Sequence, residues 1–157
     1  MYQENIIDML MQKMIRFNQN DPQRIDHLIK VHSFAQMIGR MEQLYGHSQF
    51  LTECAALVHD IGIRPAEEKY GMSNGRLQEQ EGPFYARKML GELGFENCHH
   101  DYDKPKNKLL QLLMEADLIV NCYENRPDHK KAEYIKKIFQ TDGGKELLAL
   151  CLKKEME

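Results

Sequence analysis

The chain has 157 residues, with 21 Lys and Arg against 24 Asp and Glu, which gives a formal net charge of −3. This near-neutral balance argues against a polybasic nucleic-acid-binding surface or a basic membrane arm, because both need an excess of positive charge. The hydrophobic content of 42% and charged content of 29% are typical of a globular protein, and we expect residues 1–157 to form a single domain.

Nothing in the sequence indicates export or membrane insertion. The apolar runs are far shorter than the roughly 20 residues that cross a bilayer. The N-terminal text MYQENIIDML lacks the basic region of a secretory signal. The cysteines are widely spaced and form no CxxC pair, at Cys54, Cys98, Cys122 and Cys151. We therefore expect a cytoplasmic protein with free thiols.

Apolar residues recur every three to four positions, which predicts an all-α bundle of about six to seven helices. The first helix is expected over residues 5–17. The second covers 22–45, with Pro22 in its first turn and Gly46 after its end. The third covers 49–59, with Ser48 as its N-cap.

The second half of the chain contains more turn-forming residues. The glycines, prolines and charges of residues 63–78 predict an ordered surface loop. A further helix is expected from Pro83, placed in its first turn, to residue 93. The last three helices are expected over residues 108–123, 129–139 and 144–154.

Polar groups fall on the apolar faces of three of these helices. His59 and Asp60 directly follow the apolar run AALV. His27 shares a helical stripe with Val31, Phe34, Ile38 and Met41. Asp117 shares a second stripe with Leu110, Leu113 and Val120. The pattern predicts that all four polar side chains face the core.

A shared metal ion would satisfy these groups together. An unpaired buried charge costs several kcal/mol, so inward acids and histidines need a partner. Imidazole nitrogen with carboxylate oxygen is a donor set for transition metals rather than for calcium. We expect His27, His59, Asp60 and Asp117 to hold one divalent ion, with Mn, Fe, Zn, Co, Ni and Mg all left open.

The local text around these residues, RIDHLIKVHSFA, AALVHDIG and LLMEADLIVN, resembles the HD-domain metal-dependent phosphohydrolases. The resemblance covers roughly residues 20–125. It implies an all-helical HD-domain bundle, a divalent metal on the same four residues and a small phosphorylated substrate, commonly a nucleotide. It implies neither a nucleic-acid polymer nor a membrane as partner, and the oligomeric state is left open.

Relatives with two metals add histidines after the loop, whereas GRLQEQEGPFYA contains none. We therefore expect a single ion. His99 and His100 resemble a histidine pair that precedes the last Asp in many relatives, although the stretch before them is shorter here. We expect them near the pocket, as proton donor or phosphate contact.

A bound metal ion supplies both an activated water and a Lewis acid for phosphoester hydrolysis. Positive side chains would assist by contacting phosphate oxygens, and the candidates are Arg24, Arg64, Lys69 and His100. The general acid or base is sought among four residues, with Glu81 and His99 preferred over Glu67 and Glu68. His32 is expected to pack or to support the ligands from behind.

Two other functions stay open. The first is a non-catalytic HD module that keeps the metal for ligand sensing or interaction, which the short stretch before His99 favours. The second is a metal-free helical interaction domain, which would leave the inward polar residues unexplained.

Overall fold

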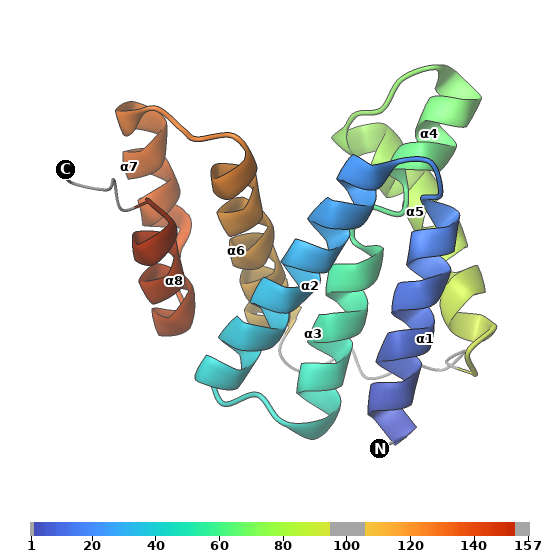
Figure 1. Cartoon of the computed structure of the whole chain (residues 1–157), viewed down its shortest axis with the longest axis horizontal. Coiled ribbons are helices and arrows are strands. Elements are labelled where there is room, and N and C mark those ends of the chain that lie inside the picture. The colour runs from blue at the N-terminus through green and yellow to red at the C-terminus, as the bar shows by residue number, and fades with distance from the viewer. Residues whose placement is uncertain (1, 95–105, 153–157) are drawn as a thin grey trace. The chain divides into compact units, whose positions relative to one another are not determined.

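The computed structural model describes residues 2–94 and 106–152, and in these ranges it is all helical, without a strand (Figure 1). The prediction of an all-α protein is confirmed. The described residues form eight helices: α1 (Tyr2–Phe17), α2 (Pro22–Met41), α3 (Gly46–Val58), α4 (Ile63–Tyr70), α5 (Gly75–Gly91), α6 (Lys106–Glu124), α7 (His129–Ile138) and α8 (Asp142–Leu152).

The contacts within the chain divide it into two compact units. Unit 1 comprises Met1–Ile29 and Cys54–Lys104, and unit 2 comprises Lys30–Glu53 and Pro105–Glu157. Both α2 and α3 are unbroken helices that contribute residues to each unit. The expectation of a single domain over residues 1–157 stays a prediction.

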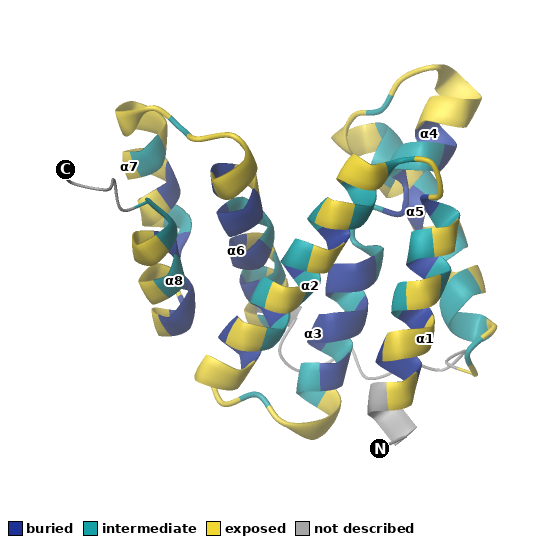
Figure 2. Ribbon diagram, viewed as in Figure 1, coloured by how far each residue is buried: buried dark blue, intermediate teal, exposed yellow. Residues whose placement is uncertain are grey.

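In unit 1, α1 and α5 pack against each other, and α5 also packs against α4. The buried face of α1 includes Ile6, Leu10 and Met14, spaced four residues apart as one helix face requires. Figure 2 shows buried segments alternating with more exposed ones along this helix. At the end of α1, the rings of Phe17 and Tyr85 lie 5.9 Å apart between centroids. These contacts fix α5 along one side of the unit.

The loop predicted over residues 63–78 is wrong, because α4 and the start of α5 occupy most of it. Pro65 is the third residue of α4, where a helix has no internal acceptor for the backbone N–H that proline lacks. Gly71 ends α4 with φ of 69°. Asn74 caps α5, since its Oδ1 accepts a hydrogen bond from the Leu77 N–H at 3.0 Å.

The prediction that Pro83 opens a helix is also wrong, because α5 begins eight residues earlier. Pro83 therefore lies inside α5 and removes one backbone hydrogen bond from it. The Asn74 cap and the packing of α5 on α4 outweigh this loss.

In unit 2, the end of α2 and the start of α3 form a helical hairpin. The turn contains Gln43 at φ of 57°, and the Leu44 N–H donates to the Gly39 carbonyl at 2.8 Å. This turn ends α2 at Met41 rather than at the predicted residue 45. Ser48 lies inside α3 and is not its N-cap, because the helix already begins at Gly46.

Glu53 is a buried carboxylate in this hairpin. It accepts hydrogen bonds from Gln49 and Gln36 at 2.8 and 2.9 Å, and it lies 3.0 Å from Nε2 of His32. Burial disfavours its charge, but the hydrogen bonds from His32, Gln49 and Gln36 outweigh burial and hold the pKa of Glu53 below its usual value of 4.5. His32 therefore supports a buried acid that the sequence did not single out.

Glu115 is a second buried carboxylate, on α6, and it binds the segment that leads into α8. It accepts hydrogen bonds from the N–H groups of Gln140 and Thr141 at 2.6 and 3.1 Å, and also from the Thr141 hydroxyl. Gly144 leaves room for it, since a Cβ there would lie 2.0 Å from Glu115 Oε2. This network joins α6 to α8 within unit 2.

Within the described residues, no helix is both long and apolar enough to span a membrane. Cys122 and Cys151 are free thiols, as predicted, whereas Cys54 is buried and Cys98 lies outside the described residues. Burial raises the pKa of the Cys122 and Cys151 thiols, which keeps them protonated and unreactive.

Candidate metal centre

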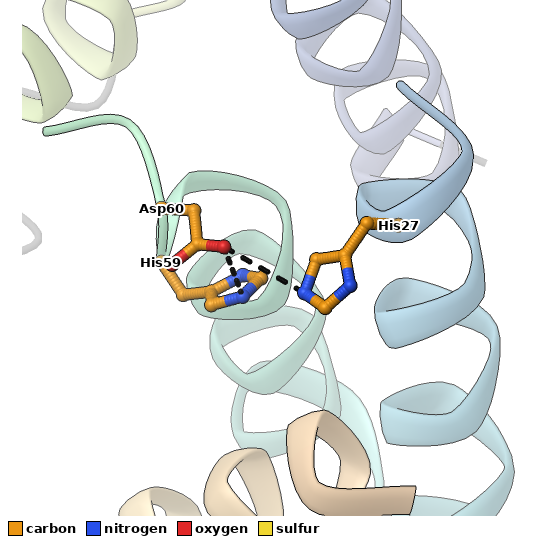
Figure 3. Close-up of side chains that lie close together, drawn as sticks. All are labelled: His27, His59 and Asp60. Carbon is orange, nitrogen blue, oxygen red and sulfur yellow. Dashed lines mark ion pairs between the residues drawn. The ribbon is translucent and has the colours of Figure 1, made fainter. Parts of the chain in front are cut away.

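Three side chains predicted as metal ligands meet in unit 1 (Figure 3). His27 comes from the second turn of α2, while His59 and Asp60 come from the turn that follows α3. One potential ligand atom of each lies within 4.8 Å of the other two. Residues 32 positions apart in the sequence thus form one group of metal-binding type.

The Asp60 carboxylate lies between the two imidazoles. Its Oδ2 is 3.3 Å from Nε2 of His59 and 3.6 Å from Nε2 of His27. The two rings are 5.6 Å apart between centroids and inclined at 40°. Both histidines therefore present the same nitrogen, Nε2, to one carboxylate oxygen.

A backbone contact fixes the tautomer of His59. Its Nδ1 lies 2.8 Å from the carbonyl oxygen of Ala56, which can only accept a hydrogen bond, so Nδ1 carries the proton. In the neutral ring Nε2 then holds a lone pair, and it faces a carboxylate oxygen that also holds lone pairs. A proton or a metal cation between these atoms removes their repulsion.

The spacing of the three donor atoms fits such a cation. A metal bonded at about 2.1 Å in tetrahedral geometry holds neighbouring ligand atoms about 3.4 Å apart. The two distances to Asp60 Oδ2, 3.3 and 3.6 Å, lie on either side of this value. Two imidazole nitrogens and one carboxylate oxygen also form a donor set that divalent transition metals prefer.

The group is open to solvent on the carboxylate side. The side chains of His27 and His59 are 16% and 12% exposed, whereas Asp60 is 37% exposed. Solvent therefore reaches Asp60 more than it reaches the two imidazoles.

The fourth predicted ligand belongs to unit 2, and the histidine pair is not among the described residues. Asp117 is half-buried on α6, in unit 2, and its membership of the group stays a prediction. His99 and His100 fall outside the described residues.

The predicted apolar stripes are only partly buried. In the stripe of His27, Val31 and Ile38 are fully buried, but Met41 is 39% exposed. In the stripe of Asp117, Val120 is fully buried but Leu110 is 64% exposed. Helical period thus predicted buried members of each stripe correctly, but one end of each stripe is exposed.

The three described basic residues proposed to contact phosphate each lie against a carboxylate. Arg24 pairs with Glu67 at 2.6 Å, and Arg64 pairs with Glu68 at 2.8 Å through its Nε. Lys69 lies 2.9 Å from Glu81. The sequence did not predict these pairs, because the residues around a surface charge in the sequence do not show which other side chain it contacts.

Glu81 is ionised by the same contacts. The ammonium of Lys69 and the hydroxyl of Tyr70 both donate to its Oε1, and together they hold the pKa of Glu81 below its usual value. A carboxylate in this setting is poorly suited to act as a general acid. Its predicted catalytic role stays a prediction.

Comparison with known proteins gives no match to a family model, a curated protein or a solved structure. The likeness to HD-domain phosphohydrolases therefore rests on the sequence motifs, and membership of that family stays a prediction.

Proposed function

We propose that the chain is a divalent-metal-dependent phosphohydrolase acting on a small phosphorylated molecule, with a nucleotide as the first substrate to test. The observation that carries the proposal is the meeting of His27, His59 and Asp60, with the Nε2 lone pair of His59 directed at the Asp60 carboxylate. Asp117 is proposed as the fourth ligand, and one ion is expected per chain.

The residues of this group have separable roles. His27 and His59 supply neutral nitrogen donors, and Asp60 supplies the negative charge that retains a dication. The Ala56 carbonyl orients the ring of His59 from behind, as outer contacts of metal-ligating histidines commonly do. A bound divalent ion would lower the pKa of a coordinated water and polarise a phosphoryl oxygen.

A non-catalytic metal module is the second candidate, and one observation favours it. Arg24, Arg64 and Lys69 all lie within ion-pair distance of chain carboxylates. A phosphohydrolase uses positively charged side chains to stabilise the negative charge on the phosphate oxygens. If these three side chains stay paired with carboxylates of the chain, only the metal ion would stabilise that charge.

The first test is metal content. The chain, purified without chelator or a nickel column, should hold close to one ion, measured by elemental analysis. Asp60→Ala should lose it, because the carboxylate that lies near both imidazoles is removed, whereas Asp8→Ala, an exposed aspartate on α1, should retain it. Full occupancy in Asp60→Ala would contradict the assignment of the site.

The second test is turnover. Phosphomonoesters, nucleotides, cyclic dinucleotides and dinucleoside polyphosphates should be screened with Mn, Co, Mg and, under anaerobic conditions, ferrous iron. Hydrolysis that disappears in Asp60→Ala and persists in Asp8→Ala supports the enzyme. Retained metal with no hydrolysis in any combination favours the non-catalytic module.

A further inference from the structure

The ion pair between Arg24 and Glu67 joins the two segments that carry the proposed ligands. Arg24 lies in the first turn of α2, three residues before His27, and side chains at this spacing share a helix face. Glu67 lies on α4, which begins three residues after Asp60. All of these residues belong to unit 1.

The contact has the form of an oxyanion bound to a guanidinium. Nη2 of Arg24 lies 2.6 and 2.7 Å from the two carboxylate oxygens of Glu67, and Nε lies 3.3 Å from Oδ2 of Asp21. Asp21 therefore contacts the same guanidinium as Glu67. Glu67 thus occupies the position that two oxygens of a phosphate would take.

This pair is open to exchange. The side chains of Arg24 and Glu67 are 27% and 42% exposed, and solvent-exposed ion pairs contribute little to stability. A phosphate monoester carries up to two negative charges and three acceptor oxygens, so it competes well with one carboxylate for a guanidinium.

The other two basic residues have contacts of a different kind. Arg64 donates from Nη1 to the Phe17 carbonyl at the end of α1, in addition to its pair with Glu68. Lys69 lies between Glu81 and Tyr70, and these contacts raise its pKa above the usual value. Arg24 is the residue of the three that shares a helix face with a proposed ligand.

We propose that Arg24 binds the phosphate group of the substrate, and that Glu67 occupies it in the ligand-free chain and must leave when phosphate binds. The proposal rests on the proposed function for the identity of the ligand, a phosphate monoester. Glu67 is then an internal competitor that weakens phosphate binding and excludes ligands with too little negative charge.

Calorimetric titration of inorganic phosphate into the full chain tests this competition, with Mn²⁺ present and after chelator treatment. Glu67→Gln should lower the Kd for phosphate roughly two- to fivefold, the range set by loss of an exposed ion pair. Glu92→Gln is the matched control, because it makes the same charge change at a glutamate of unit 1 whose ion-pair partner, Lys13, is not a proposed phosphate contact. It should leave the Kd unchanged.

Arg24→Gln should weaken phosphate binding, and adding Glu67→Gln to it should restore nothing. An equal gain in Glu92→Gln, or a gain from Glu67→Gln that survives without Arg24, would overturn the assignment, as would absence of phosphate binding in both wild type and Glu67→Gln. The affinities could follow this pattern while no substrate is hydrolysed. That result would support the Arg24 assignment and count against the proposed hydrolase activity.

Discussion

At Glu53, burial and hydrogen bonding act on one carboxylate in opposite directions. The hydrogen bonds prevail, so the folded chain holds the pKa of this group below its unfolded value. A depressed folded pKa adds stability above the unfolded pKa, and this stability is lost as the pH falls through the folded pKa. Glu53 therefore makes the free energy of unfolding fall on acidification.

We predict that Glu53→Gln destabilises the chain by about 1–3 kcal/mol near neutral pH, because a charge-assisted hydrogen bond to His32 is lost. As the pH falls below about 5 and through the lowered folded pKa, the variant should then lose less free energy of unfolding than the wild type. Urea denaturation at several pH values measures both effects. Glu79→Gln, an exposed glutamate on α5, should keep the wild-type pH dependence. Identical slopes for Glu53→Gln and wild type would contradict this account.

At the scale of elements, the turn that carries His59 and Asp60 packs directly on the backbone of α5. A Cβ added to Gly62 would lie 2.4 Å from the carbonyl oxygen of Gln78 and 2.9 Å from its Cα. Backbone atoms cannot move aside as a flexible side chain does, so α5 or the turn must shift. Gly62 is thus a positioning residue for the candidate ligands.

We predict that Gly62→Ala lowers the free energy of unfolding by about 1–3 kcal/mol, as overpacking of a tight contact does. It should also raise the Kd for Mn²⁺, because the displaced turn moves His59 and Asp60 relative to His27. Gly75→Ala is the control, since a Cβ there meets nothing within 4 Å. Urea denaturation and metal titration check the two effects. Wild-type metal affinity in a destabilised Gly62→Ala would show that the contact serves stability alone.

The helical period predicted most elements within a few residues, because apolar spacing reports directly on which face is buried. It failed over residues 63–78, where Pro65 and the glycines indicate a loop although the first turn of α4 tolerates proline and Gly71 ends it. Local composition identified the boundary residues but not the short helix between them.

At the candidate site, too, local sequence predicted some features and missed others. His27, His59 and Asp60 were predictable because each lies on or beside an apolar face, where a polar group needs a partner. The buried Glu53 and Glu115 were missed, since their partners lie at other places in the chain, among them Gln36 and Thr141. Pairs such as Arg24 with Glu67 likewise depend on tertiary structure alone.

At the scale of the whole molecule, α2 and α3 each contribute to both units. Unfolding either unit alone would interrupt two helices and expose their backbone hydrogen-bonding groups. The two units should therefore unfold together, as the expectation of a single domain over residues 1–157 requires.

We predict one calorimetric transition for the metal-loaded chain, moved as a whole to lower temperature by chelator. A ligand bound only to the folded state stabilises it by about 2.7 kcal/mol at one hundred times its Kd. Asp60→Ala should melt at nearly the same temperature with and without chelator. Two separate transitions, with only one of them sensitive to chelator, would show that the units are independent domains.

The hydrogen bond from His59 to the carbonyl of Ala56 has a consequence for how this site tolerates sequence change. The proton of the ring is positioned by the main chain, which every amino acid supplies. Substitutions at position 56 are therefore limited by the space around a fully buried alanine and not by the chemistry of the neighbouring imidazole. The main chain of α3 sets the orientation of His59. Side chains around the site can therefore change in related sequences while the ring keeps its lone pair toward Asp60.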